Sequence, residues 1–235
     1  MVRRVLPVFA ALSLLAGCGR EMGNLSFSAH AATAGTPASA AAKLVLAGGR
    51  IELTRVRMVI RDVKLEREGL EEEVEAEDGP FLLDLAGAEL AGGIKHLFSI
   101  SVPVGTYDDL RFVVHKLEDG QRIGDADVDS SRASIVLDLT VDGEPFRFTT
   151  DVNDTQRIAG TFVVDAKGSP DNITIDIDPT GWFTAGDGSF LDPRDGANRQ
   201  AIEDNLRRSI DAFDDDDRDG HDDDGPGNDD GSGHH

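Results

Sequence analysis

From residue 44 to residue 183, apolar and polar positions alternate along most of the chain. A period of two places every second side chain on the same face of a strand, so each alternating stretch predicts a strand with one buried face. The stretches with this spacing are 81–85, 98–102, 110–114, 135–141 and 173–177. The side chains expected to point inward include Ile135, Leu137, Leu139, Phe146, Phe148, Ile173, Ile175 and Ile177.

The stretch from 51 to 65 departs from simple alternation because its apolar parity changes twice. Its apolar positions are Ile51 and Leu53, then Val56, Met58 and Ile60, then Val63 and Leu65. A strand that exchanges its two faces needs a bulge or a break. The pattern therefore predicts either two short strands or one bulged strand.

Turn residues separate the predicted strands. Asp142-Gly143 lies between the 135–141 stretch and the stretch that contains Phe146, which predicts a hairpin. Val102-Pro103-Val104-Gly105 fits a type I turn, with proline second and glycine fourth. Because short, closely spaced strands without intervening helical patterns form antiparallel sheets, residues 43–183 are predicted to form an all-β, antiparallel β-sandwich.

The segments on either side of the sandwich have a different character. Residues 18–42 are rich in Ala, Gly, Ser and Thr, which predicts a linker, and an alternation at 24–31 makes that part a candidate first strand. In 184–213, Ile202, Leu206, Ile210 and Phe213 follow a helical spacing, which predicts a loop and an amphipathic helix. Residues 214–235 are dominated by Asp, Gly and His, which predicts a disordered acidic tail.

The formal net charge of the chain is −22, and residues 211–235 contribute −10 of it through eleven Asp and one Arg. A charge of this sign repels phosphate backbones, so nucleic acid is excluded as a favoured partner. Cations and basic protein surfaces are the partners that the charge favours.

Cys18 is the single cysteine of the chain, which excludes an internal disulfide. Residues 1–17 read as a signal peptide, with Arg3 and Arg4, an apolar stretch over 5–15 and small residues before Cys18. The apolar stretch is shorter than the ~20 residues that span a bilayer. Leu15-Ala16-Gly17-Cys18 resembles the bacterial lipobox, which implies that Cys18 is lipidated and becomes the mature N-terminus. Gly19 stands where an Asp retains Gram-negative lipoproteins on the inner membrane, which implies the outer membrane.

Four segments between residues 49 and 183 together resemble a family of bacterial lipoproteins of unknown function. These segments are 56–65, Gly79-Pro80-Phe81-Leu82-Leu83-Asp84-Leu85, Val102-Pro103-Val104-Gly105-Thr106-Tyr107 and 173–178. The resemblance implies a transthyretin-like or immunoglobulin-like sandwich and a location in the cell envelope. It implies no established chemistry.

The sequence lacks the Gly-x-Ser-x-Gly, His-Glu-x-x-His and phosphate-binding glycine-rich motifs of common enzymes. We therefore predict a non-enzymatic, lipid-anchored envelope protein whose sandwich binds an envelope protein partner or serves structurally. A hydrolase built on scattered carboxylates is one alternative.

Metal binding is another alternative. Asp215, Asp217, Asp219 and Asp223 have the spacing of oxygen ligands in a Ca²⁺ loop, with Gly220 at the turn. The loop departs from the EF-hand because Asp222 replaces the usual aliphatic residue and Pro226 replaces the bidentate Glu. A solvated acidic tail is the competing interpretation of this run.

Two weaker metal patterns lie inside the predicted sandwich. Asp125, Asp127 and Asp129 alternate as in a Ca²⁺ loop but lack the glycine, so a polar loop between strands is the favoured interpretation. His96 and His115 lie in or beside predicted strands and suit Cu or Zn if the sheet brings them together. Ordinary packing of the two histidines is the alternative.

Overall fold

The computed structural model describes residues 21–31, 43–67, 69, 73–77, 79–166, 171–215, 217, 218, 220 and 221. The predicted signal peptide and Cys18 lie outside these residues. The strands are β1 (Met22–Ala31), β2 (Leu44–Leu46), β3 (Ile51–Arg67), β4 (Glu73–Glu77), β5 (Phe81–Ala86), β6 (Lys95–Pro103), β7 (Gly105–Val114), β8 (Ile135–Val141), β9 (Glu144–Thr150), β10 (Asp154–Val164), β11 (Asp171–Ile177) and β12 (Ile210–Asp214). The α-helices are α1 (Ala126–Ser131) and α2 (Arg199–Arg207), and short 3-10 helices are η1 (Ala47–Gly49), η2 (Gly87–Ala91), η3 (Pro179–Gly181) and η4 (Gly196–Asn198).

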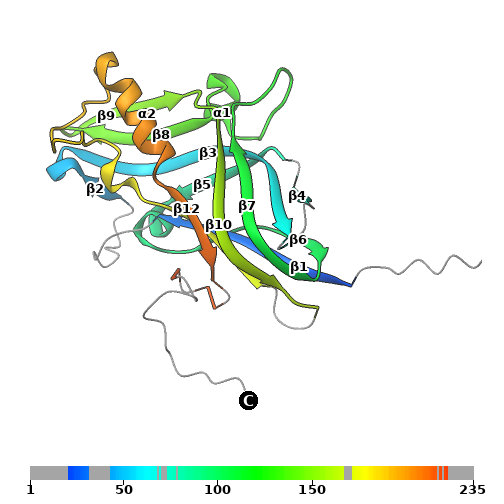
Figure 1. Cartoon of the computed structure of the whole chain (residues 1–235). Coiled ribbons are helices and arrows are strands. Elements are labelled where there is room, and N and C mark those ends of the chain that lie inside the picture. The colour runs from blue at the N-terminus through cyan, green and yellow to red at the C-terminus, as the bar shows by residue number, and fades with distance from the viewer. Residues whose placement is uncertain are drawn as a thin grey trace, which may run out of the picture.

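The strands form two sheets that enclose one hydrophobic core (Figure 1). The smaller sheet has the order β12-β11-β1-β6, and the larger has the order β10-β7-β3-β8-β9 with β2, β4 and β5 also paired to β3. The prediction of an all-β sandwich is confirmed. The β1–β11 pair is parallel, whereas the other described strand pairs are antiparallel.

The region with changing parity is one bulged strand, β3, which resolves the two alternatives left by the sequence. The pairing of β3 with β8 shifts register between Leu53 and Arg55, and its pairing with β7 shifts between Arg61 and Lys64. Asp62, inside the second bulge, has a left-handed φ of 54°. Along one edge, β3 pairs first with β8 and then, from Ile60 onward, with β7. The bulges therefore let a single strand serve two neighbours in succession.

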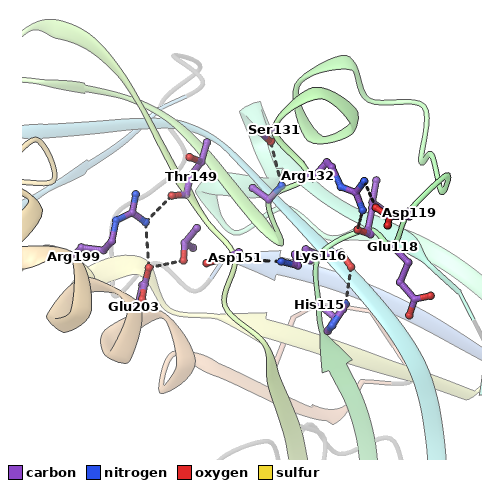
Figure 2. A pocket seen from close by; sticks show the side chains of 13 residues that line it. His115, Lys116, Glu118, Asp119, Ser131, Arg132, Thr149, Asp151, Arg199 and Glu203 are labelled. Atoms are coloured by element: carbon purple, nitrogen blue, oxygen red, sulfur yellow. Dashed lines mark hydrogen bonds and ion pairs between the residues drawn. The ribbon is translucent and has the colours of Figure 1, made fainter.

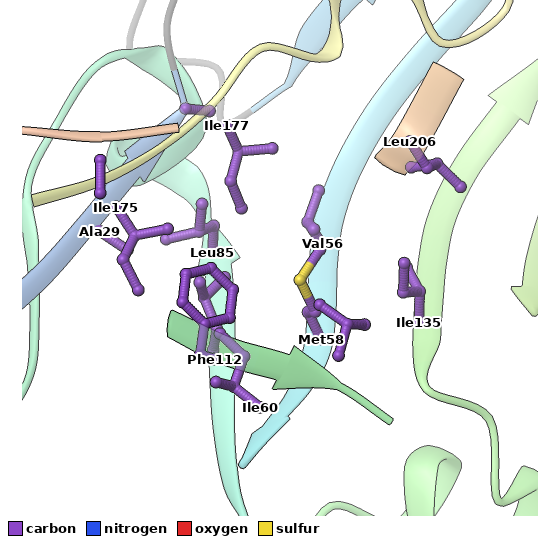
Figure 3. Packing of buried hydrophobic residues seen from close by; sticks show 14 of the residues in the cluster. Ala29, Val56, Met58, Ile60, Leu85, Phe112, Ile135, Ile175, Ile177 and Leu206 are labelled. Atoms are coloured by element: carbon purple, nitrogen blue, oxygen red, sulfur yellow. The ribbon is translucent and has the colours of Figure 1, made fainter. Parts of the chain in front are cut away.

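The core is built from the inward positions of both sheets together with α2 (Figure 3). Of the side chains predicted to point inward, seven are buried and Phe146 is partly buried against the same cluster. From α2, Ile202 and Leu206 join this core. The periodicity of the sequence therefore identified the buried faces of β8, β9 and β11 correctly.

The Asp142-Gly143 hairpin between β8 and β9 is also confirmed. Asp142 and Gly143 have φ values of 52° and 86°, as the two central residues of a type I′ turn require. Arg50 donates to the Asp142 carboxylate over 2.8 Å, and Arg194 adds a bond of 3.0 Å. These bonds, that from Arg50 above all, lower the pKa of Asp142 to about 2.

The smaller sheet also includes strands from outside residues 43–183. The sandwich was expected to span 43–183, yet β1 lies between β11 and β6 inside the smaller sheet, and β12 forms an edge of that sheet. The candidate first strand at 24–31 is therefore present, as residues 22–31, and it belongs to the sandwich and not to the 18–42 linker. Leu25, Phe27, Ala29 and Ala31 are buried in the core, so the apolar alternation of this segment outweighs its small-residue composition.

The helix predicted within 184–213 is shorter than its spacing suggested. Helix α2 ends at Arg207, and Ile210–Asp214 form β12. β12 pairs with the otherwise free edge of β11, so backbone hydrogen bonds to a neighbouring strand outweigh the helical spacing of Ile210 and Phe213. The tail was expected to begin at 214, but Asp214 belongs to β12 and Asp215 is fully buried.

We expect Leu137→Ala to lower the free energy of unfolding by ~2–5 kcal/mol, as large-to-small changes in a packed core do. Leu137 is 0% exposed. Val45→Ala is the matched control, because Val45 is 56% exposed and should cost no more than ~0.5 kcal/mol. Urea unfolding of the soluble domain measures both changes, and similar values for the two variants would contradict the assigned core.

Candidate functional site

A groove of about 1100 Å³ opens where the larger sheet meets α2 (Figure 2). One wall consists of the chain after β7 and the chain after α1, represented by Lys116 and Arg132. The other wall consists of the end of β9 and the start of α2, represented by Asp151 and Arg199. Two other pockets on the described surface, beside β8 and β9 and beside β10, are smaller, at about 430 and 500 Å³.

The groove exists because of the change of partner along β3. β7 ends at Val114 and β8 begins at Ile135, and both pair with the same edge of β3. Val59 marks the junction, since its amide donates to the Ser134 carbonyl and its carbonyl accepts from the His115 amide. The intervening segment 115–134 must therefore leave the sheet, and it carries α1 and one wall of the groove.

The wall formed by β9 and α2 is held together around Glu203. Its carboxylate accepts a hydrogen bond of 2.6 Å from the Thr150 hydroxyl and one of 3.2 Å from Arg199. Arg199 also donates to the Thr149 carbonyl over 2.8 Å and lies over the ring of Phe148. The Glu203 side chain is 13% exposed, whereas Arg199 is 49% exposed. The carboxylate is thus a fixed structural group, and the guanidinium faces the groove.

The opposite wall carries exposed ion pairs. Lys116 reaches across the groove to Asp151, with 3.8 Å between charged atoms. Arg132 pairs with Asp119 at 2.7 Å and donates to the Leu117 carbonyl. Because the partners Asp151 and Asp119 are 75% and 99% exposed, each of these pairs contributes little to stability and can exchange its partner.

Arg57, on the outer face of β3, fixes α1 to the larger sheet. Its side chain is 0% exposed and donates to Asp125 at 3.0 Å, to Asp127 at 2.7 Å and to Asp138. The hydrogen bond from Arg57 is the main reason that the pKa of Asp127 is lowered. Burial opposes ionisation of Asp125, but the Val128 amide and Arg57 outweigh it and lower the pKa of this carboxyl as well.

The Asp125, Asp127 and Asp129 pattern therefore binds arginine and backbone amides. Asp125 caps α1 by accepting from the amides of Asp127 and Val128, and Asp129 accepts from the Ile123 amide. The sequence had assigned a polar loop here and missed the short helix. The sequence did contain a signal for the arginine that pairs with these carboxylates. Arg55 and Arg57 alternate with apolar residues on a predicted strand and must share its outward face.

The predicted Ca²⁺ ligands lie partly within the described chain. Asp215 is buried, and its carboxylate accepts from the Thr174 hydroxyl at 2.6 Å and from the Gly220 amide at 3.3 Å. Asp217 is exposed, and Asp219 and Asp223 lie outside the described residues. Among the residues that the structure places, no group of three or more potential metal ligands converges. The Ca²⁺ site stays a prediction.

The two histidines considered for Cu or Zn lie on different sheets. His96 is in β6 of the smaller sheet, whereas His115 follows β7 of the larger sheet and lines the groove. The buried histidine is instead His30 of β1, which the sequence analysis did not single out. Its Nε2 lies 3.1 Å from a carboxylate oxygen of Asp176, and its ring meets that of Phe213 edge-on.

We expect Arg57→Met to cost about 3 kcal/mol of unfolding free energy, because it leaves three carboxylates around an uncharged side chain. This is the lower end of the range for a broken buried pair, since Asp127 and Asp138 are partly exposed and keep Arg147. The stabilisation that Asp127 gives is complete above its unfolded pKa of about 3.9 and is lost as the pH falls below it. The variant should therefore lose less unfolding free energy than the wild type as the pH falls from about 5 to about 2, a range that brackets the unfolded pKa of Asp.

The matched control is Arg111→Met, which removes an arginine on an exposed pair with Glu73 and should cost no more than ~1 kcal/mol. Hydrogen exchange supplies a local readout, since Arg57→Met should raise exchange in segment 117–134 beyond the global effect. Uniform exchange across the sheet would refute a specific role in holding α1.

Comparisons with known proteins leave the family of the chain open. No family model matches the chain, and no curated protein matches it. Among solved structures, it is similar to MbnP from Methylosinus trichosporium, with 14% identity, a TM-score of 0.35 and coverage of 68% of this chain and 76% of that chain. The resemblance to the lipoprotein family stays a prediction.

Proposed function

We propose that this chain is a lipid-anchored envelope protein whose sandwich binds a protein partner in its groove. The observation that carries the proposal is the position of β1. This strand begins at Met22, four residues after Cys18, and lies between two strands of the smaller sheet. A lipid on Cys18 would thus be joined almost directly to the core.

The groove lies away from this attachment, partway along β3 at the junction of β7 and β8. The start of β1 adjoins the start of β7, because the Val104 amide donates to the Glu21 carbonyl over 2.9 Å. β7 then runs from Gly105 to Val114, just before His115 in the groove wall. At about 3.3 Å per residue, the strand carries the groove roughly 30 Å from the anchored end. An anchored molecule would direct the groove away from the lipid.

The charges of the groove support a binding role. Lys116, Arg132 and Arg199 stand among acidic residues, and each is paired within the chain. A partner surface that carries charges of both signs can replace these exposed pairs with pairs of its own, which favours specificity and rapid association. Gly19 supports the outer membrane as the location, through the resemblance to Gram-negative lipoproteins. The described residues contain no helix long and apolar enough to cross a membrane.

Ca²⁺ binding at the start of the tail is a second candidate function, favoured by the backbone of Gly220 and its hydrogen bond to Asp215. Asp215, Asp217 and Asp219 stand at the first, third and fifth positions of a Ca²⁺ loop, and Gly220 stands at the sixth. Gly220 has a φ of 84°, and its amide closes the turn on the Asp215 carboxylate. Glycine provides the sharp turn at this position of such loops.

We expect Cys18→Ser to move the protein from the membrane fraction to the soluble fraction, because acyl chains contribute ~0.8 kcal/mol per buried CH₂ and nothing would replace them. Fractionation after a salt wash and mass spectrometry of the N-terminal peptide measure the effect. Gly19→Asp is the control that keeps the lipid and should redirect the protein to the inner membrane. Continued sedimentation of Cys18→Ser with membranes would show that the anchor lies elsewhere.

For the Ca²⁺ candidate, titration calorimetry on the soluble domain should give a dissociation constant no tighter than ~10⁻⁴–10⁻³ M, since the loop lacks the bidentate Glu. The double variant Asp217→Asn, Asp219→Asn should abolish the heat. Asp211→Asn is the matched control, because it removes one exposed charge on β12 outside the loop. Equal heats from both variants would assign binding to general attraction by the acidic tail.

A further inference from the structure

We propose that one defined end of the sandwich rests on the lipid surface and is held there by the short connection to Cys18. This anchor end consists of Met22, Pro103, Val104, Gly105 and Val163. The inference depends on the proposed lipidation of Cys18, and it adds which surface of the domain meets the membrane.

Covalent geometry limits how far the anchor end can lie from the bilayer. Cys18 and Met22 are four residues apart, and a chain spans at most ~3.6 Å per residue, or about 14 Å. The polar layer on each side of a bilayer is roughly 6 Å thick, from the difference between ~42 Å and ~30 Å. With the acyl chains of Cys18 in the hydrocarbon, Met22 stands at most about 8 Å above the headgroups.

Several strand ends are packed together around Met22. The Val104 amide bonds to Glu21, and Arg67 at the end of β3 donates to the Val104 carbonyl over 2.8 Å. A Cβ built on Gly23 would lie 2.5 Å from the carbonyl oxygen of Asp165, just after β10, so the backbones of β1 and β10 are in close contact here. Figure 1 shows β1, β6, β7 and β10 converging at the lower right. The chain next to Cys18 therefore cannot approach the bilayer without bringing these ends with it.

The anchor end also carries exposed apolar side chains. Met22 is 48% exposed and Val163 is 43% exposed, and they rank among the few large hydrophobic residues exposed in the described chain. Met22 has the parity of the outward positions of β1, and Val163 lies between the buried Phe162 and Val164 on β10. Met22 thus lies on the outer face of the smaller sheet and Val163 on the outer face of the larger sheet, both at the anchor end.

The charge of this end favours lipid contact through apolar groups. Glu21 and Asp165 are exposed beside it and both are acidic, whereas the one described cation at this end, Arg67, is bonded to the Val104 carbonyl. Acidic groups are not attracted to anionic headgroups, so the contact should depend on the acyl chains, on Met22 and on Val163, and should resist salt. The anchor end therefore contacts the lipid surface around the protein's own acyl chains.

The test uses the full-length, lipidated chain with one new cysteine. Because the lipid occupies the sulfur of Cys18, Val163→Cys provides a single free thiol. Val45→Cys is the matched control, since Val45 is also an exposed valine but pairs with Glu52 at the opposite end of β3. That position lies about 50 Å from the anchor end along β3, at 3.3 Å per residue. Both thiols receive the same small fluorophore, and the protein is reconstituted into phosphatidylcholine vesicles that contain a lipid-attached quencher.

We expect several-fold stronger quenching at position 163 than at position 45, with no change in high salt. Equal quenching at the two positions, with the protein still floating with vesicles, would overturn the proposed orientation and leave the anchor intact. A free thiol on Cys18 together with loss of flotation would overturn both the anchor and the orientation. Unchanged thermal unfolding of the two variants controls for folding.

A spacer separates the effect of the short connection from general adhesion. Twelve Gly and Ser residues inserted between Gly19 and Arg20 would add a mean separation of about 19 Å, from ~5.5 Å times the square root of the length. Quenching at position 163 should then fall to the level at position 45, while flotation is unchanged. Strong quenching that persists with the spacer would overturn the role of the short connection in setting the contact.

Discussion

The structure depends on β3, the long bulged strand that serves both halves of the larger sheet. Hydrogen bonds join it to β8 and then to β7 on one edge, and to β2, β5 and β4 on the other. A regular strand of this length would turn its apolar residues to the wrong face where its partner changes. The bulges restore the apolar face. β8 and β7 pair with the same edge on either side of Val59, and the gap between them releases segment 115–134 and forms the groove.

Electrostatics in this acidic chain are organised around arginines that hold several carboxylates. Arg57 is the clearest case, because it is fully buried and joins Asp125, Asp127 and Asp138 from two different elements. Its carboxylates share Arg55 and Arg147 as further partners, so the charges form a network with alternating sign. Such a network compensates the cost of burying a guanidinium and fixes one wall of the groove.

The anchor end and the groove lie in different parts of the sandwich and have different roles in the proposed function. The start of β1 connects the core to Cys18 within four residues, and the groove lies one strand length away. A rigid sheet between the two ends transmits orientation, whereas a long linker would leave the groove free to tumble. The proposed anchor and the proposed binding site are therefore related through the same strands.

The sequence by itself determined the features that depend on local chemistry. The period of two identified the buried face of β8 and β11, the parity changes in 51–65 predicted either a break or a bulge, and Asp142-Gly143 specified its hairpin. Only the tertiary structure decided the features that depend on distant partners. Residues 210–214 form a strand because β11 offers a free edge, β1 joins the smaller sheet because β11 and β6 flank it, and Asp127 meets Arg57 because β3 lies beneath α1. Side-chain spacing reports which face is apolar, but the backbone and ionic partners of a segment are set by what the fold places beside it.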